Sequence, residues 1–255
     1  MLIKKFVKSL PITYELVRKS IYKKKAYKLD SSLTKSKDIL ETLLKDGIAV
    51  IPSYYDTETV DNIVNDLYPS MEQLSKVEKD AVRVLDGQFR LDNADLKNKY
   101  AKDFFDDQDI YDIAKAYVSK DVKSEFRIAD YSNKIGAFGR SDSWHFDDII
   151  HRFKAFLYLS DVDERNAPFI YLVGSHKDEA WRYPQEHIYW QHDLDGSLNC
   201  FHPHQVERLK TKFGFKEKIF TGKKGDVILV DTKGLHRRGA LHEGERLILV
   251  NYFEV

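Results

Sequence analysis

The second half of the chain is dominated by short runs of β-branched and aromatic residues, and this pattern constrains the fold most strongly. The runs begin at about Ser124 and are separated by Gly, Asn, Asp and Pro. They span residues 124–131, 153–159, 169–173, 226–230 and 247–252. Many short strands without intervening helices are typical of an antiparallel sandwich or jelly roll, and untypical of a parallel α/β sheet.

The first part of the chain carries helical signals instead. Apolar residues recur at helical spacing over 36–44 and 56–74, and the short apolar run 48–52 between them predicts a buried strand. Apolar residues make up 42% of the chain, which is enough for a packed core. We therefore expect one mainly β domain with flanking helices over residues 36–255.

Residues 178–215 form a stretch rich in aromatic residues and histidines but without a clean period, and we interpret it as an insertion over one mouth of the barrel. Its most conspicuous side chains are Trp181, Tyr183, His187, Tyr189, Trp190 and His192. These side chains could line a substrate pocket, or they could form the core of the insertion itself.

The N-terminal segment 1–35 is strongly basic, with nine Lys or Arg against the single acid Glu15 within residues 1–28. No apolar stretch suits a signal peptide, and none approaches the roughly 20 residues of a membrane span. We expect a helix here, either solvated and packed on the domain or in peripheral contact with an anionic membrane surface or an acidic substrate.

The overall charge and the cysteine content limit the partners and the compartment. Lys plus Arg and Asp plus Glu are equal at 41 each, whereas proteins that bind nucleic acid usually carry a basic excess. The single cysteine, Cys200, cannot form an intramolecular disulfide. We expect a cytoplasmic protein that acts on a small molecule and does not bind nucleic acid.

Two His-x-Asp triplets occur, His145-Phe146-Asp147 and a second at residues 176–178. In a strand, residues i and i+2 point to the same face, so His145 and Asp147 could contact one metal ion. The second triplet follows a turn-like Val-Gly-Ser sequence, where such alternation is not ensured. The first triplet is therefore the better candidate for a metal site.

Non-haem iron(II) sites use two histidines and one carboxylate, so a third ligand is required. His236 is the natural candidate because it follows the strand-like run 226–231 after a turn at Gly234. Arg246 heads the next strand-like run ten residues later, and a tight return can bring it alongside His236. Its guanidinium is suited to bidentate binding of a carboxylate.

These motifs together resemble the phytanoyl-CoA dioxygenase family. The resemblance rests on WHFD at 144–147, NAPFIYLVGSHK at 166–177 and GDVILVD at 225–231, followed by His236 and Arg246. It extends over roughly residues 45–255, because DGIAVIP at 46–52 is similar to the first strand of the family.

The resemblance implies a double-stranded β-helix (a jelly roll of cupin type) and a dioxygenase that uses iron(II), 2-oxoglutarate and O2. Such enzymes release succinate and CO2 and hydroxylate an unactivated C–H bond, with ascorbate as the reductant in vitro. It assigns iron to His145, Asp147 and His236, and the distal carboxylate of 2-oxoglutarate to Arg246. By family position it also implies cosubstrate contacts at Arg127 and Phe156.

The chain departs from the family pattern in three places, none of which removes a ligand. Val173 replaces the proline of the family's Pro-Gly-Ser-His loop, Ala167 replaces a glycine, and Arg238 stands where a serine often contacts 2-oxoglutarate. The iron halogenases of the wider superfamily have a small residue in place of the carboxylate ligand. Because Asp147 is present, hydroxylation, desaturation or ring closure is favoured over halogenation.

Two other classes of function remain compatible with these residues. One is a metal-dependent isomerase or lyase of cupin type without redox chemistry, in which Arg246 would have no 2-oxoglutarate to hold. The other is a catalytically silent binding module with the same fold. The substrate stays open among a sugar, a lipid-linked intermediate and another small metabolite, and so does the oligomeric state.

Overall fold

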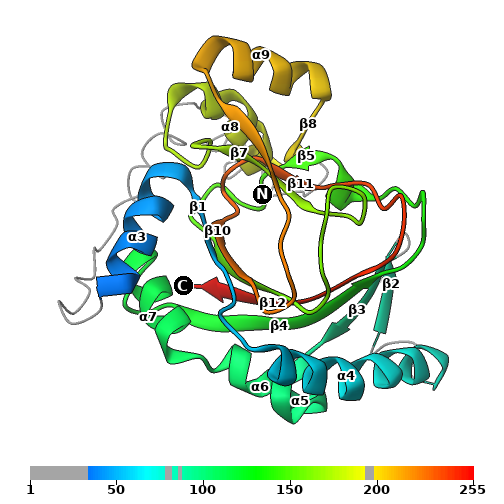
Figure 1. Cartoon of the computed structure of the whole chain (residues 1–255). Helices are drawn as coiled ribbons and strands as arrows, with labels where there is room; N and C mark the ends of the chain where they lie inside the picture. The colour runs from blue at the N-terminus through cyan, green and yellow to red at the C-terminus, as the bar shows by residue number, and fades with distance from the viewer. Residues whose placement is uncertain (1–33, 78–81, 86–87, 193–197) are drawn as a thin grey trace, which may run out of the picture.

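Two antiparallel sheets face each other in the computed structural model of the chain (Figure 1). In spatial order, the larger sheet contains β1 (Ile48–Ile51), β10 (Val227–Asp231), β6 (Phe153–Tyr158), β12 (Arg246–Glu254), β4 (Lys123–Ser132), β3 (Gln88–Asp92) and β2 (Val82–Leu85). The smaller sheet contains β8 (Cys200–Phe201), β5 (Trp144–His145), β11 (His236–Arg238), β7 (Phe169–Val173) and β9 (Lys216–Phe220). This arrangement is the predicted double-stranded β-helix with flanking helices.

The structure describes residues 34–77, 82–85, 88–192 and 198–255. The prediction of a basic helical segment over 1–35 therefore lies almost entirely outside the described residues. Within these four ranges, no helix is both long enough and apolar enough to cross a bilayer.

Five helices precede β4 within the described ranges. They are α3 (Thr34–Asp46), α4 (Thr57–Val77), α5 (Ala94–Lys97), α6 (Lys99–Phe105) and α7 (Gln108–Tyr117). Side chains cap three of them. Asp56 accepts a hydrogen bond from the amide of Thr59 at the start of α4, Asn98 accepts one from the amide of Ala101, and Asp107 accepts one from the amide of Ile110. In Figure 1, helices α4 to α6 lie beneath β4 and β12, so they shield the outer face of the larger sheet from water.

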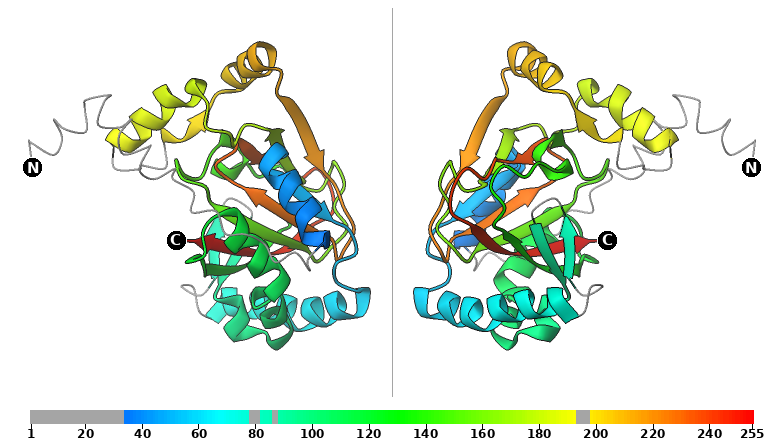
Figure 2. Two further views of the ribbon diagram at one scale, coloured as in Figure 1. Left: turned by 90° about the vertical axis from the view of Figure 1, so that its left-hand side faces the viewer. Right: turned by 90° about the vertical axis from the view of Figure 1, so that its right-hand side faces the viewer.

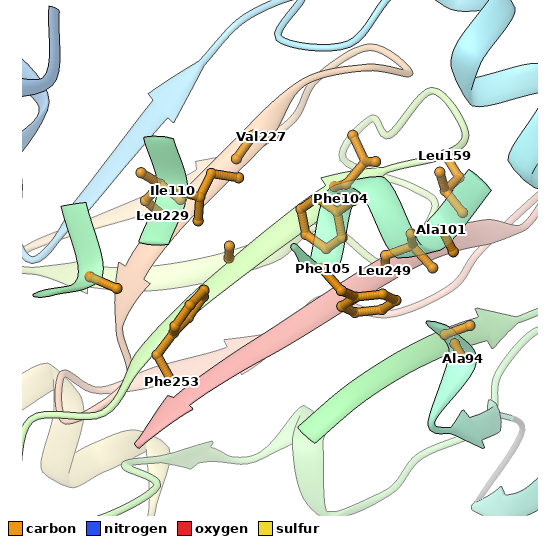
Figure 3. Close-up of a cluster of buried hydrophobic side chains, with 14 of the residues drawn as sticks. Ala94, Ala101, Phe104, Phe105, Ile110, Leu159, Val227, Leu229, Leu249 and Phe253 are labelled. Atoms are coloured by element: carbon orange, nitrogen blue, oxygen red, sulfur yellow. The ribbon is translucent and has the colours of Figure 1, made fainter. Parts of the chain in front are cut away.

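The main hydrophobic core lies between these helices and the larger sheet (Figure 3). Phe104 and Phe105 of α6 are fully buried there, together with Leu249 and Phe253 of β12. Strand β4 contributes Ala129 to this core, whereas its neighbour Ile128 belongs to the cluster between the two sheets. This alternation decides which side chains of β4 can reach the interior of the barrel.

The insertion is helical, contrary to the irregular stretch that its sequence suggests. It contains a 3-10 turn (Ala180–Arg182), α8 (Tyr183–Gln191), β8 and α9 (Pro203–Phe213), and its helices stand at the opposite end of the molecule from α4 to α6 (Figure 2). The aromatic residues of the insertion contact different neighbours. Tyr189 packs on Phe146, whereas Trp181 packs on Phe201 and Phe215. Their side chains therefore do not share one face, and no helical period is visible.

A third cluster of buried residues joins the insertion to the outer face of the smaller sheet. Trp144, Ile170 and Leu235 of the sheet side meet Tyr189 and Val206 of the insertion in this cluster. The residues that alternate with them, including His145 and His236, face the opposite way. The insertion thus supports the smaller sheet from behind, and its aromatic residues form a core rather than the wall of the barrel interior.

Candidate metal centre and cosubstrate pocket

His145 and His236 lie directly opposite each other on the neighbouring strands β5 and β11. Side chains at opposed positions of an antiparallel pair share a face, and here the two imidazole rings are 4.3 Å apart between centroids. The pairing is non-local, since the two strands are far apart in the chain. Register between these strands therefore places both histidines inside the barrel.

Asp147 completes the group from the turn that follows β5. Its backbone N–H donates to Thr232 O at 2.9 Å, which ties this turn to the segment leading into β11. Its Oδ1 lies 3.8 Å from Nε2 of His145 and 3.8 Å from Nε2 of His236. One ligand atom from each residue lies within 4.8 Å of the others, and no second such group of three His, Cys, Asp or Glu side chains occurs among the described residues.

The protonation pattern of the histidines suits a metal site. Nδ1 of His145 donates to Ser143 O at 2.7 Å, and Nδ1 of His236 donates to Gly234 O at 2.9 Å. With the proton on Nδ1, the lone pair of each Nε2 points into the site. Burial lowers the pKa of His145 and lowers that of His236 to about 3, so both rings are neutral at physiological pH.

Lys154 of β6 holds the other oxygen of the aspartate. Its Nζ lies 2.5 Å from Asp147 Oδ2 and 3.9 Å from the ring centre of Tyr252. Burial alone would raise the pKa of Asp147, but the ammonium of Lys154 and the two histidines lower it well below its usual range. Asp147 is therefore a carboxylate with Oδ1 directed toward the histidines.

The donor set fits an iron(II) ion. Two imidazole nitrogens and one carboxylate oxygen are the ligands of the facial triad of non-haem iron enzymes. The hydrogen bonds that orient both rings are the outer contacts that such ligands require. Phe169 stacks on His236, with ring centroids 5.4 Å apart, and packs at a tilt against Phe156 at 5.2 Å, so an apolar wall adjoins the site.

A cavity of about 400 Å³ extends from this triad into the barrel and reaches Arg246 of β12. The guanidinium of Arg246 is buried, with Nη1 donating to Ala167 O at 2.8 Å and Nη2 3.7 Å from Asp130 Oδ1. Its Nε has no hydrogen-bond partner in the described part of the chain. A buried charged donor without a partner costs free energy, and a carboxylate ligand in the cavity would satisfy it.

A comparison with protein families identifies the chain. The sequence model of the phytanoyl-CoA dioxygenase (PhyH) family matches residues 43–242, most of the chain and nearly all of the two-sheet domain. The chain belongs to this family. A search of curated protein sequences found no match.

Solved structures of iron- and 2-oxoglutarate-dependent enzymes share the fold of this PhyH-family protein. EctD from S. alaskensis with bound Fe superposes with a TM-score of 0.69 at 14% identity, covering 91% of this chain and 80% of EctD. The epimerase SnoN gives 0.63 at 14% identity (86% and 82% covered), and the carbocyclase SnoK gives 0.61 at 13% (89% and 87% covered). SnoN and SnoK belong to nogalamycin biosynthesis, and further structures of EctD and SnoN contain 2-oxoglutarate or α-ketoglutarate.

Five of the six predicted site residues of this PhyH-family protein lie around the same cavity. They are His145, Asp147, Phe156, His236 and Arg246. The second triplet lies elsewhere: Nε2 of His176 is 3.3 Å from Leu44 O, outside the metal group. The first triplet is therefore the one in the metal group, although the strand expected there ends at His145.

The structure does not bring Arg127 to this cavity. Arg127 points toward the helical layer, where its Nη1 lies 2.9 Å from Asp95 Oδ2 and 2.9 Å from Asp106 Oδ1. Counting from the family pattern selected a residue on the wrong face of β4. Asp130, an odd number of positions further along, lines the cavity instead.

Sequence reasoning missed four further charged residues that line the cavity: Arg90, Asp130, Arg140 and Lys154. Arg90 of β3 pairs with Asp130 of β4 through Nε at 3.2 Å and Nη2 at 2.9 Å. The alternation of β6 could have revealed Lys154, because it is two residues before Phe156. The others depend on contacts between distant segments, which have no local signal.

The structure also shows the surroundings of two of the three departures from the family pattern. Arg238 pairs with Asp142 at 2.6 and 2.8 Å and donates to Ser132 Oγ at 3.2 Å, so its charge is compensated beside the cavity. Ala167 has a φ of 61°, a conformation that favours glycine. The glycine that the family usually has would therefore fit this turn. The carbonyl of Ala167 accepts the hydrogen bond from Arg246.

Two polar residues near the first triplet stabilise the turn that carries Asp147. Asp148 forms an ion pair with Arg152, at 3.1 Å from its Nη2. His151 Nδ1 donates to Asp231, which also accepts a hydrogen bond from Tyr117 at 2.7 Å. Neither Asp148 nor His151 lines the cavity.

Proposed function

We propose that the protein is an iron(II)- and 2-oxoglutarate-dependent oxygenase that oxidises a C–H bond of a small organic molecule. One observation carries this proposal: the three metal-binding side chains and the buried guanidinium of Arg246 lie around a single cavity. Family membership and the fold of EctD, SnoN and SnoK support it.

In this proposal, His145, Asp147 and His236 would hold iron(II). When bound, the iron would supply O2 activation coupled to decarboxylation of 2-oxoglutarate to succinate and CO2. Arg246 binds the distal carboxylate of 2-oxoglutarate through donors that the protein leaves available. Phe156 and Phe169 restrict water on one side of the iron.

Hydroxylation is the proposed outcome, because Asp147 supplies a carboxylate at the position where halogenases have a small residue. The similarity to an epimerase and a carbocyclase makes inversion of a stereocentre or ring closure the second candidate. Analysis of the product distinguishes these outcomes, since only hydroxylation adds an oxygen atom from O2 to the substrate. A metal-dependent lyase without redox chemistry is disfavoured, because it would give no role to the buried Arg246.

The test is succinate formation by the purified protein with iron(II), 2-oxoglutarate, ascorbate and O2. Wild-type protein should form succinate above the rate without protein, and His145→Ala should lose that activity. His204→Ala is the matched control because His204 is exposed on α9, and it should behave as wild type. Equal succinate from wild type and His145→Ala would refute the proposal.

A further inference from the structure

The cationic side chains around the cavity outnumber the carboxylates that neutralise them. Five cations line it: Arg90, Arg140, Lys154, Arg238 and Arg246. Three of them have a carboxylate within 3 Å, namely Arg90 with Asp130, Lys154 with Asp147 and Arg238 with Asp142. Arg246 has only a more distant contact, at 3.7 Å, with the same Asp130 that pairs with Arg90, and Arg140 has no ion-pair partner among the described residues.

If the proposed function is correct, the cosubstrate neutralises the charge of Arg246. Its position at the buried end of the cavity suits the distal carboxylate of 2-oxoglutarate. The other carboxylate and the keto oxygen of the cosubstrate would bind iron and compensate its charge. Arg140 therefore stays uncompensated even with iron and 2-oxoglutarate bound.

Arg140 lies in the 3-10 turn (Arg140–Asp142) that precedes β5, and it is exposed at the mouth of the cavity. Within the described ranges, no carboxylate lies within 4.0 Å of its guanidinium in an ion pair. Its Nη2 donates instead to the neutral Oδ1 of Asn199 at 2.8 Å. The arginine is therefore held in place without loss of its charge.

Asn199 is a buried, hydrogen-bonded partner of this arginine. Its side chain is buried, and its Nδ2 donates to Phe146 O between the two iron ligands of the triplet. The amide of Phe146 in turn donates to Asn199 O at 3.3 Å. Arg140 is thus positioned relative to the strand that carries His145.

We propose that Arg140 binds an oxyanion group of the substrate (a carboxylate, sulfate or phosphate) at the mouth of the iron cavity. This proposal rests on the proposed function and specifies its substrate class as a small organic anion. A guanidinium that is already positioned loses little side-chain entropy when it binds such a group, and its planar donors fit two oxygens. The excess positive charge would also attract anions to the cavity.

The test measures binding of matched probes to the anaerobic complex of the protein with iron(II) and 2-oxoglutarate. The pairs are benzoate and benzamide, hexanoate and hexanamide, and glucose 6-phosphate and glucose, with dissociation constants from ligand-observed NMR. Wild type should prefer the anion of at least one pair. Arg140→Gln should weaken binding of that anion by roughly tenfold, which is about the lower limit for the contribution of one charged hydrogen bond.

Two variants make this result specific. Arg140→Lys keeps the charge and should retain part of the preference, whereas Arg165→Gln removes one exposed arginine that is paired with Glu243 and should retain all of it. The carboxylate and phosphate pairs show which kind of oxyanion the site accepts.

Three outcomes would overturn the proposal. One is the absence of anion preference in every pair, whether both members bind or neither does. Another is an anion preference that persists in Arg140→Gln. The third is a loss of 2-oxoglutarate affinity in Arg140→Gln as large as in Arg246→Ala, which would place Arg140 in the cosubstrate site. Failure of the proposed function is distinguishable, because 2-oxoglutarate would then produce no visible charge-transfer band with iron(II) in wild type.

Discussion

Lys154 Nζ and Asp147 Oδ2 are 2.5 Å apart, and this contact leaves only Oδ1 of the carboxylate facing the two histidines. A carboxylate held in this way can bind a metal through one oxygen, so that a coordination position stays open. Lys154 is buried between Asp147 and the ring of Tyr252, which restricts its movement.

Lys154→Met should weaken metal binding, because the side chain keeps a similar length but no longer holds Oδ2. We expect a loss of roughly 10- to 100-fold in cobalt(II) affinity, as is typical when an outer contact of a metal ligand is removed. Competition with a fluorescent chelator measures this affinity. Lys218→Met, at an exposed position of β9, is the control, and equal affinity in both variants would show that Lys154 does not orient Asp147.

Arg246→Ala should raise the KM for 2-oxoglutarate by roughly 100-fold, because two charged hydrogen bonds to the distal carboxylate would be lost. Arg246→Lys should give an intermediate value, since an ammonium keeps the charge without the planar pair of donors. The succinate assay at varied 2-oxoglutarate concentration gives both values. An unchanged KM in Arg246→Ala would mean that another residue anchors the cosubstrate.

Arg127→Gln should reduce stability without changing the KM for 2-oxoglutarate. The substitution leaves Asp95 and Asp106 without their shared arginine beneath the larger sheet. We expect a decrease of about 1–2 kcal/mol in the free energy of unfolding, because this ion pair is partly buried. Urea unfolding and the succinate assay test the two statements separately, and a raised KM would restore the family-based assignment of Arg127.

The free energy of unfolding of the metal-free protein should decrease as the pH falls below 6.5. Burial, followed by the neighbouring His145, lowers the pKa of His236 from 6.5 to about 3. The unfolded chain therefore binds a proton first, and the contribution of His236 to stability is present above pH 6.5 and lost progressively toward pH 3. The slope from this group is at most about 1.4 kcal/mol per pH unit.

Urea unfolding between pH 7 and 4 measures this slope. His236→Gln should reduce the slope by up to about 1.4 kcal/mol per pH unit, which corresponds to the uptake of one proton. His204→Gln, at the exposed control position, should leave the slope unchanged. The same slope in wild type and His236→Gln would indicate that His236 is protonated in the folded protein at these pH values.

The features predicted correctly from the sequence are those with a local signal. Runs of β-branched and aromatic residues bounded by turn residues located β4, β6, β7, β10 and β12 to within a few residues, and apolar residues at helical spacing did the same for α3 and α4. His145 and Asp147 are separated by a single residue, so they had to lie close together, although β5 ends at His145 and Asp147 lies in the turn that follows. His236 and Arg246 required the order of motifs along the chain, which the family resemblance supplied.

The features that were missed depend on register between distant strands. Arg90 meets Asp130 only because β3 pairs with β4 at that position. Arg127 was misplaced because a family offset does not state which face of a twisted strand a residue occupies. Arg140 is held at the cavity by its hydrogen bond to Asn199. No sequence pattern predicts such a contact between residues that are far apart in the chain.

The pairing of His145 with His236 joins two parts of the chain that are separated by the whole insertion. A metal ion held by both histidines would close a loop of roughly 90 residues, and closing a loop of that length removes considerable entropy from the unfolded chain. The ion would then act as a removable cross-link as well as a reagent. Chelation should therefore loosen the smaller sheet and expose the insertion to proteases before the helix-covered sheet unfolds.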